Sequence, residues 1–67
     1  MIETVVNGER TELESELTLA AWLEAKGRDA RTVAIELNGD IVPRARFGET
    51  TIRHGDRLEV VAFVQGG

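Results

Sequence analysis

The sequence ends with Leu58-Glu59-Val60-Val61-Ala62-Phe63-Val64-Gln65-Gly66-Gly67, an apolar strand pattern that runs directly into two glycines. Glycine has no Cβ, so Gly66 and Gly67 can enter a narrow cleft without a side-chain clash. At ~3.3 to 3.6 Å per extended residue, residues 64–67 can carry a terminal carboxylate on the order of 13 Å beyond a sheet. We therefore expect a flexible tail over about 65–67 that presents Gly67 to a partner enzyme. The alternative is a frayed end without function.

The same strand pattern divides into two faces, because successive side chains of a strand point to opposite sides. Leu58, Val60, Ala62 and Val64 share one face, and Glu59, Val61 and Phe63 share the other. The face without the glutamate is expected to be the core face. Val61 and Phe63 then form an apolar patch beside the tail, and we expect them to contact the partner together with Gln65 and Gly66. A strand covered on both faces gives the same pattern.

The first part of the chain predicts a hairpin followed by a helix. Residues 2–6 and 9–14 have strand character and flank Asn7-Gly8, the strongest short hairpin signal because a type I′ turn needs two positive φ angles. Thr18 is in N-cap position before the helical pattern of 19–26, and Gly27 is the expected stop. Trp22 is expected to be the largest side chain of the core.

The second half predicts further short strands. Residues 33–37 and 40–44 flank a second turn at Asn38-Gly39, and Pro43 should close the latter strand because proline cannot donate to a ladder. Residues 44–51 form the least regular segment. His54-Gly55-Asp56 is the last turn, and His54 is expected to be an exposed loop residue without a catalytic role.

Strands, one helix and a closing strand predict an α+β fold in which the helix lies across one face of a mixed sheet. The most compact way to join these elements places the first and last strands side by side, as in the ubiquitin-like β-grasp. We expect residues 1–67 to form a single domain with a small core.

Composition excludes several functional classes. The chain has no cysteine and one histidine, so we expect no disulfide, no thiolate chemistry and no metal site. A formal net charge of −4 argues against nucleic acid as a partner. No apolar run is long enough to span a membrane and no signal peptide precedes the first strand, so the expected location is the cytoplasm.

Three segments together resemble the ThiS family of sulfur carrier proteins over nearly the whole chain. They are the run from Val33 to Arg44 with its Asn-Gly-Asp-Ile-Val-Pro-Arg end, the run from Gly55 to Val61, and the terminal Gly66-Gly67. Asn7-Gly8 agrees with the same pattern. Phe47 is a departure, because related sequences often carry tryptophan there.

The resemblance implies a function for Gly67. A partner similar to ubiquitin-activating enzymes would use ATP to adenylate its carboxylate, and a sulfur-relay protein such as a cysteine desulfurase would supply the sulfur of a C-terminal thiocarboxylate. Thiazole synthase would use that sulfur in thiamine biosynthesis. The chain would then be a protein substrate and not an enzyme, with ATP bound only by the partner.

Two other functions are compatible with the same residues. The small subunit of molybdopterin synthase also carries sulfur on a terminal diglycine. A ubiquitin-like modifier or a binding module would use the same fold without sulfur chemistry. Isopeptide adducts on other proteins would indicate a modifier, and no covalent change would indicate a binding module.

Overall fold

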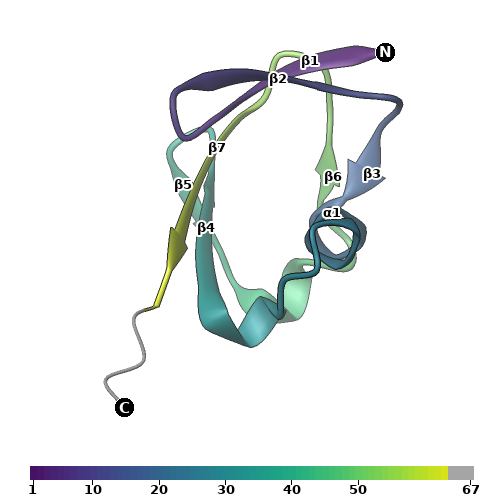
Figure 1. Cartoon of the computed structure of the whole chain (residues 1–67). Helices are drawn as coiled ribbons and strands as arrows, with labels where there is room; N and C mark the ends of the chain where they lie inside the picture. The colour runs from purple at the N-terminus through teal and green to yellow at the C-terminus, as the bar shows by residue number, and fades with distance from the viewer. Residues whose placement is uncertain (64–67) are drawn as a thin grey trace.

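The computed structural model of the chain describes residues 1–63. A five-stranded mixed sheet carries one α-helix on one of its faces, and a second, two-stranded sheet lies beside the helix (Figure 1). The elements are β1 (Ile2–Val6), β2 (Glu9–Leu13), β3 (Leu17–Thr18), α1 (Leu19–Ala25), a 3-10 turn (Ala30–Thr32), β4 (Val33–Leu37), β5 (Asp40–Val42), a second 3-10 turn (Arg44–Arg46), β6 (Thr51–Ile52) and β7 (Arg57–Ala62).

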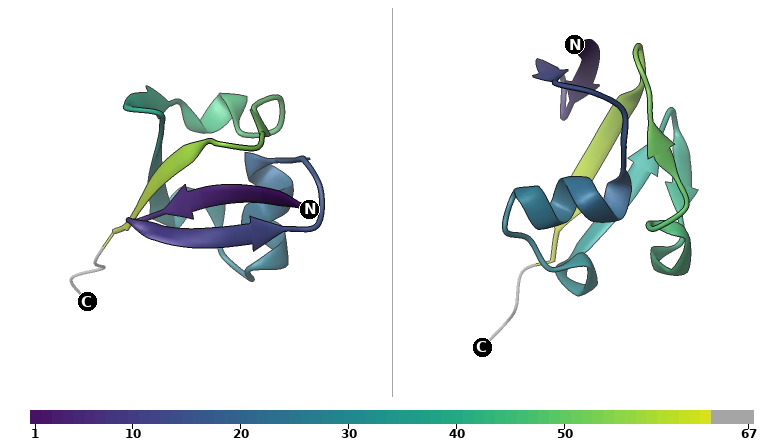
Figure 2. Two further views of the ribbon diagram at one scale, coloured as in Figure 1. Left: turned by 90° about the horizontal axis from the view of Figure 1, so that it is seen from above. Right: turned by 90° about the vertical axis from the view of Figure 1, so that its right-hand side faces the viewer.

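The last strand, β7, occupies the centre of the large sheet, whose order is β2-β1-β7-β4-β5. It runs parallel to β1 and antiparallel to β4, so the first and last strands of the sequence are neighbours in the sheet (Figure 2). This confirms the β-grasp arrangement and the pairing of the first and last strands. Within residues 1–63, no helix is long and apolar enough to cross a membrane.

Both predicted hairpin turns have the backbone that their residues favour. Asn7 and Gly8 have φ angles of 51° and 83°, and Asn38 and Gly39 have 52° and 90°. Asparagine tolerates positive φ better than most residues and glycine has no penalty there, which explains the Asn-Gly sequence of both turns. Each turn closes an antiparallel hairpin, β1–β2 and β4–β5.

The helix begins and ends close to the predicted positions. The Thr18 hydroxyl accepts a hydrogen bond from the Ala21 N–H at 3.1 Å, and Gly27 has a φ of 71° just beyond the helix. Leu19, Trp22 and Leu23 are buried, as the spacing i, i+3, i+4 predicts. Lys26 lies outside the last helical turn and is exposed, with its Nζ 5.6 Å from the centroid of the Trp22 ring.

The core lies between α1 and the sheet face that it covers. Its buried hydrophobic side chains are Leu19, Trp22, Leu23, Val33, Ile35, Phe47, Ile52 and Leu58. Trp22 is 5% exposed, which confirms its predicted place, and its indole Nε1 is buried without a hydrogen-bond partner in the described part of the chain. The helix and the strands contribute side chains to one continuous hydrophobic cluster, so packing against α1 holds the central strands together.

The segment predicted to be the least regular contributes more than expected. Phe47 and Ile52 are fully or almost fully buried, and Thr51–Ile52 pairs with Leu17–Thr18. The carbonyl of Phe47 accepts a hydrogen bond from the Ala20 N–H at 3.0 Å and that of Thr50 from the Leu19 N–H at 2.9 Å. The first N–H groups of a helix lack partners within the helix, so this segment caps α1.

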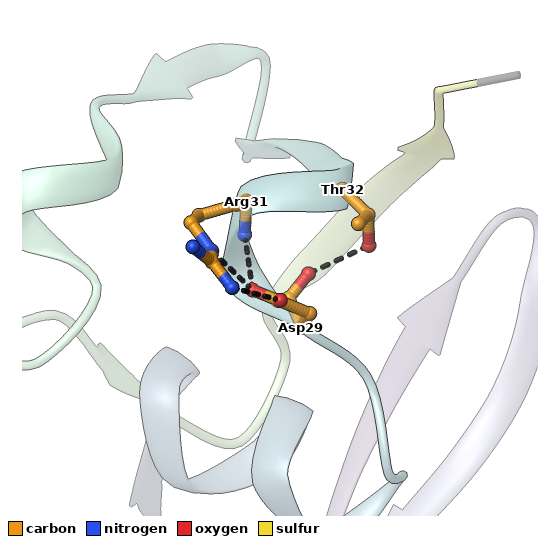
Figure 3. A network of polar contacts seen from close by, with 3 residues as sticks. All are labelled: Asp29, Arg31 and Thr32. Atoms are coloured by element: carbon orange, nitrogen blue, oxygen red, sulfur yellow. Dashed lines mark hydrogen bonds and ion pairs between the residues drawn. The ribbon is translucent and has the colours of Figure 1, made fainter. Parts of the chain in front are cut away.

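A compact polar network lies at the start of β4. Asp29 accepts hydrogen bonds from the Arg31 backbone N–H at 2.9 Å and from Nε and Nη2 of the same guanidinium at 3.2 and 2.9 Å (Figure 3). The Thr32 hydroxyl donates to the Asp29 carbonyl at 2.7 Å. The Arg31 side-chain bond, and then its backbone N–H, lower the pKa of Asp29 to about 2. The network fixes the turn that leads into β4.

Replacing Trp22 with alanine should lower the free energy of unfolding by ~3 to 5 kcal/mol, because it removes the largest side chain of the core. Since the stability of a small domain lies near the low end of ~5 to 15 kcal/mol, this variant will be largely unfolded on warming. Chemical denaturation measures the change. The exposed Ile41 is the control, and Ile41→Ala should change the stability by less than ~0.5 kcal/mol. Equal effects of the two substitutions would contradict the assigned core.

The carboxyl of Asp29 should titrate at about 2, well below the ordinary range of aspartate. Because the folded pKa is lowered, the contribution of this group to stability is present above its ordinary pKa and is lost as the pH falls through about 2. The ¹³C shift of the carboxyl carbon against pH measures it. Arg31→Ala should return the titration toward the ordinary range, and an unshifted wild-type carboxyl would show that the pair does not form in solution.

Candidate functional site

The end of β7 is where the chain leaves the sheet toward its last residues, and it is anchored on one side by β4. Ala62 lies opposite Val33, and the Phe63 N–H donates to the Thr32 carbonyl at 2.8 Å. Thr32 is itself held by Asp29. The polar network of Figure 3 therefore holds the backbone segment to which Phe63, the last described residue, is bonded.

The two hairpin asparagines hold β7 from both sides. On the β1 side, the Asn7 Oδ1 accepts from the Val60 N–H at 2.7 Å and its Nδ2 donates to the Val60 carbonyl at 3.2 Å. On the β4 side, the Asn38 Oδ1 accepts from the Arg57 N–H at 2.9 Å and its Nδ2 donates to Asp56 at 3.1 Å. The sequence pattern predicts these asparagines only as turn residues. A side-chain amide that bonds a distant strand leaves no local signal in a sequence.

An apolar patch occupies the sheet face opposite to α1, as predicted. Val61 is 61% exposed and Phe63 is 48% exposed. Ala34 lies directly opposite Val61, and Ile41 on β5 adds a third exposed aliphatic side chain to the same face. The helix covers only the other face, so nothing in the described residues covers these side chains.

Two glutamates border this patch. Glu36 and Glu59 lie directly opposite each other on β4 and β7, and neither is in an ion pair within residues 1–63. Like charges opposed across a pair of strands repel each other. The uncovered face is therefore apolar near the tail and acidic toward the middle of β7.

Ala62 differs from its prediction. Leu58 and Val60 are buried or half-buried on the core face, but Ala62, expected to share that face, is exposed. Ala62 lines a recess of about 270 Å³ together with residues at the end of α1. Its lining residues are Val6, Asn7, Trp22, Lys26, Arg28, Val60 and Ala62. Sequence analysis did not single out Lys26 or Arg28 as site residues.

His54 lies at the other end of β7, away from the tail. It is exposed, as predicted, and its Nδ1 accepts a hydrogen bond from the Glu3 N–H at 3.0 Å. The Gly55 N–H donates to the Glu3 carbonyl at 2.8 Å. The side chain thus caps the first residues of β1 and lies far in the fold from Phe63.

Three of the predicted site residues, Gln65, Gly66 and Gly67, lie outside the described residues. Of the predicted set, the structure therefore places Val61 and Phe63 together on one face beside the start of the tail. Residues 1–63 contain no group of three or more acidic, histidine or cysteine side chains that could hold a metal ion. The candidate site in the described residues is therefore the exposed surface around the end of β7.

Comparisons with known proteins agree on one family. A sequence model described as the ThiS family matches residues 2–67. The chain is 39% identical over 62 residues to a sulfur carrier protein ThiS of Thermus thermophilus, covering 92% of this chain and 95% of that protein. It also resembles the crystal structure of a thiamine biosynthesis protein (ThiS) from Geobacter metallireducens, with a TM-score of 0.83, 33% identity, and coverage of 98% of this chain and all of that one.

A second group of relatives is much longer. A thiazole synthase of Paramagnetospirillum magneticum is 39% identical over 66 residues, and one of Magnetococcus marinus is 36% identical over 62. The chain spans only about a fifth of the length of these two proteins, 20% and 19%. Since the family match covers residues 2–67 and the fold agrees with a solved structure of the family over 98% of the chain, this protein belongs to the ThiS family.

Proposed function

We propose that this protein is a sulfur carrier of thiamine biosynthesis and that Gly67 carries the sulfur. The observation that supports this most is the family match, which extends through residue 67 and includes the diglycine. The described part of the chain agrees with such a role. Its central strand ends next to an exposed apolar patch.

The proposed chemistry begins with a carboxylate, which is a poor electrophile because its negative charge repels nucleophiles. In an adenylyltransferase similar to ubiquitin-activating enzymes, the Gly67 carboxylate attacks the α-phosphorus of ATP, and pyrophosphate leaves. The product is an acyl adenylate, whose carbonyl carbon can now be attacked. ATP is bound by that partner and not by this chain.

Sulfur then replaces one oxygen. The terminal sulfur of a persulfide, formed by a sulfur-relay protein such as a cysteine desulfurase, attacks the acyl carbon and AMP leaves. A thiol reduces the resulting S–S bond and forms a disulfide with the relay protein's sulfur, while Gly67 keeps a thiocarboxylate. Thiazole synthase takes this sulfur for the thiazole ring. The chain is a substrate and donor throughout, and its location is proposed to be the cytoplasm.

The adenylyltransferase is proposed to dock on the face that carries Val61 and Phe63. Both side chains are more exposed than expected for core residues, and Phe63 is the last described residue before the tail. An aromatic side chain is a typical anchor of a protein interface. Docking there would bring the tail to the catalytic site of the partner, with Gln65 and Gly66 inside the cleft.

The sulfur proposal can be tested with the full-length protein, ATP, the adenylyltransferase and a sulfur donor. The wild type should gain the mass difference between one sulfur and one oxygen atom, located on the C-terminal peptide. Deleting Gly67 shortens the tail by ~3.5 Å, whereas reacting atoms must come within ~3 to 3.5 Å, so the variant should bind and fold but gain no sulfur. Adding a residue after Gly67 should have the same effect.

Intact-mass spectrometry also separates the alternatives. Sulfur on the deletion variant, or none on the wild type with its partners supplied, would refute the carrier proposal. Isopeptide adducts on other proteins would indicate a modifier. Transfer of the sulfur to a molybdopterin synthase and not to thiazole synthase would assign the chain to the other pathway.

Phe63→Asp should weaken binding to the adenylyltransferase by about tenfold or more, since burying an unpaired charge at an interface costs several kcal/mol. Titration calorimetry measures the affinity, and the melting temperature checks the fold. Ile41→Asp is the matched control, because Ile41 is exposed on the same face but two strands away from β7. Unchanged binding with a strongly lowered melting temperature would place Phe63 in the core and remove the docking patch.

A further inference from the structure

The edge of β7 that faces β1 is open at its last residue. Backbone pairing between the two strands covers Val5 opposite Arg57 and Val6 opposite Leu58, and the Asn7 N–H then donates to the Leu58 carbonyl at 2.9 Å. Beyond this point β1 turns into its hairpin, and the side chain of Asn7 replaces it as the partner of Val60. The β1–β2 turn therefore lies beside the middle of β7, at Leu58 and Val60, and β7 continues past it (Figure 1).

The direction of the backbone groups follows from the alternation of the strand. Arg57 and Phe63 bond toward the β4 side, through the Asn38 N–H and the Thr32 carbonyl, and Leu58 and Val60 bond toward the β1 side. Even-numbered residues of β7 therefore face β1. The N–H and the carbonyl of Ala62 point to the β1 side, where no described residue bonds to them.

Ala62 is also one of the residues that line the recess. The recess volume of about 270 Å³ lies just below the ~300 to 1,000 Å³ typical of small-molecule sites, and the recess is open to solvent on one side. Val6, Val60 and the Trp22 ring give it an apolar floor. An extended peptide segment fits such a half-open recess better than a small molecule that must be enclosed.

Two of the residues that line the recess, Lys26 and Arg28, are basic, and neither is in an ion pair within residues 1–63. Their backbone is held by the end of the helix, because the Lys26 N–H donates to the Trp22 carbonyl at 3.1 Å and the Arg28 N–H to the Leu23 carbonyl at 2.9 Å. The recess thus brings apolar side chains and two basic residues together with a strand end whose last backbone N–H and carbonyl have no partner in the described residues, in a chain of net charge −4.

We propose that this recess binds an extended, acidic segment of thiazole synthase, which adds to β7 at Ala62 and directs a carboxylate to Lys26 and Arg28. Main-chain hydrogen bonds to an open strand edge supply affinity, and the cations select the segment. The choice of thiazole synthase rests on the proposed function and on relatives in which a similar stretch makes up about a fifth of a thiazole synthase. Strand addition next to the last described residues would also align the tail.

Amide hydrogen exchange of the labelled full-length protein tests the backbone part. In the free protein the Ala62 amide should exchange fast, while Val61 and Phe63, whose N–H groups face β4, exchange slowly. Saturation with thiazole synthase should slow Ala62 by about tenfold or more, since exchange then requires the added segment to open. An Ala62 amide that stays fast in the complex would overturn the strand addition.

Charge reversal tests the acidic segment. Lys26→Glu and Arg28→Glu should each weaken binding of thiazole synthase by about tenfold, and Lys26→Arg and Arg28→Lys should retain it. Arg53→Glu is the control, because Arg53 is also exposed and lies by the turn at the opposite end of β7. Melting temperatures exclude unfolding as the cause.

The outcomes separate this inference from the proposed function. If thiazole synthase binds and protects the Ala62 amide but Lys26→Glu and Arg28→Glu have no effect on its affinity, the inference that the bound segment is acidic is wrong. Binding and sulfur transfer with neither protection nor charge dependence would overturn the recess site and leave the carrier function standing. No binding of thiazole synthase at all would refute both.

Discussion

The pairing of β7 with strands from both ends of the chain is the constraint on which the rest of the structure depends. β7 forms its parallel pair with β1 and its antiparallel pair with β4, and each neighbour belongs to a hairpin closed by an Asn-Gly turn. The asparagine of each turn extends a side-chain amide to β7 where the backbone ladder ends. A strand bonded on both sides cannot shift its register without breaking both sets of bonds, so the point at which the tail departs is fixed.

The single helix decides which surfaces remain for function. α1 buries Leu19, Trp22 and Leu23 against one face of the sheet, and the other face keeps its apolar side chains in solvent. The helix is also short, and Trp22 and Lys26 at its C-terminal end line the recess with Ala62. Because α1 covers only one face of the sheet, Val61 and Phe63 stay exposed on the other. Both surfaces border the same strand end, one on each side of the sheet.

The core of this domain is small, and irregular segments complete it. Phe47 and Ile52 complete the hydrophobic cluster, and the carbonyls of Phe47 and Thr50 satisfy the first N–H groups of α1. Asp29 and Arg31 play a similar part at the entry to β4. These contacts involve loops and 3-10 turns, and they hold α1 and the start of β4 in place around β7.

The sequence by itself determined the features that have a local cause. The alternation of apolar and polar residues predicted the strands and the exposed side of β7. Thr18 and Gly27 predicted the two ends of the helix, and the two Asn-Gly pairs predicted turns with positive φ angles. The segment around Phe47 and Ile52 escaped prediction because burial there depends on packing between distant residues and has no periodic pattern. The tertiary structure alone decided that Asn7 and Asn38 bond β7, that Ala62 stays exposed, and that Lys26 and Arg28 meet at one recess. Those outcomes depend on how the two hairpins and α1 are placed relative to β7, and the relative placement of elements is set by long-range packing that no local stretch of sequence encodes.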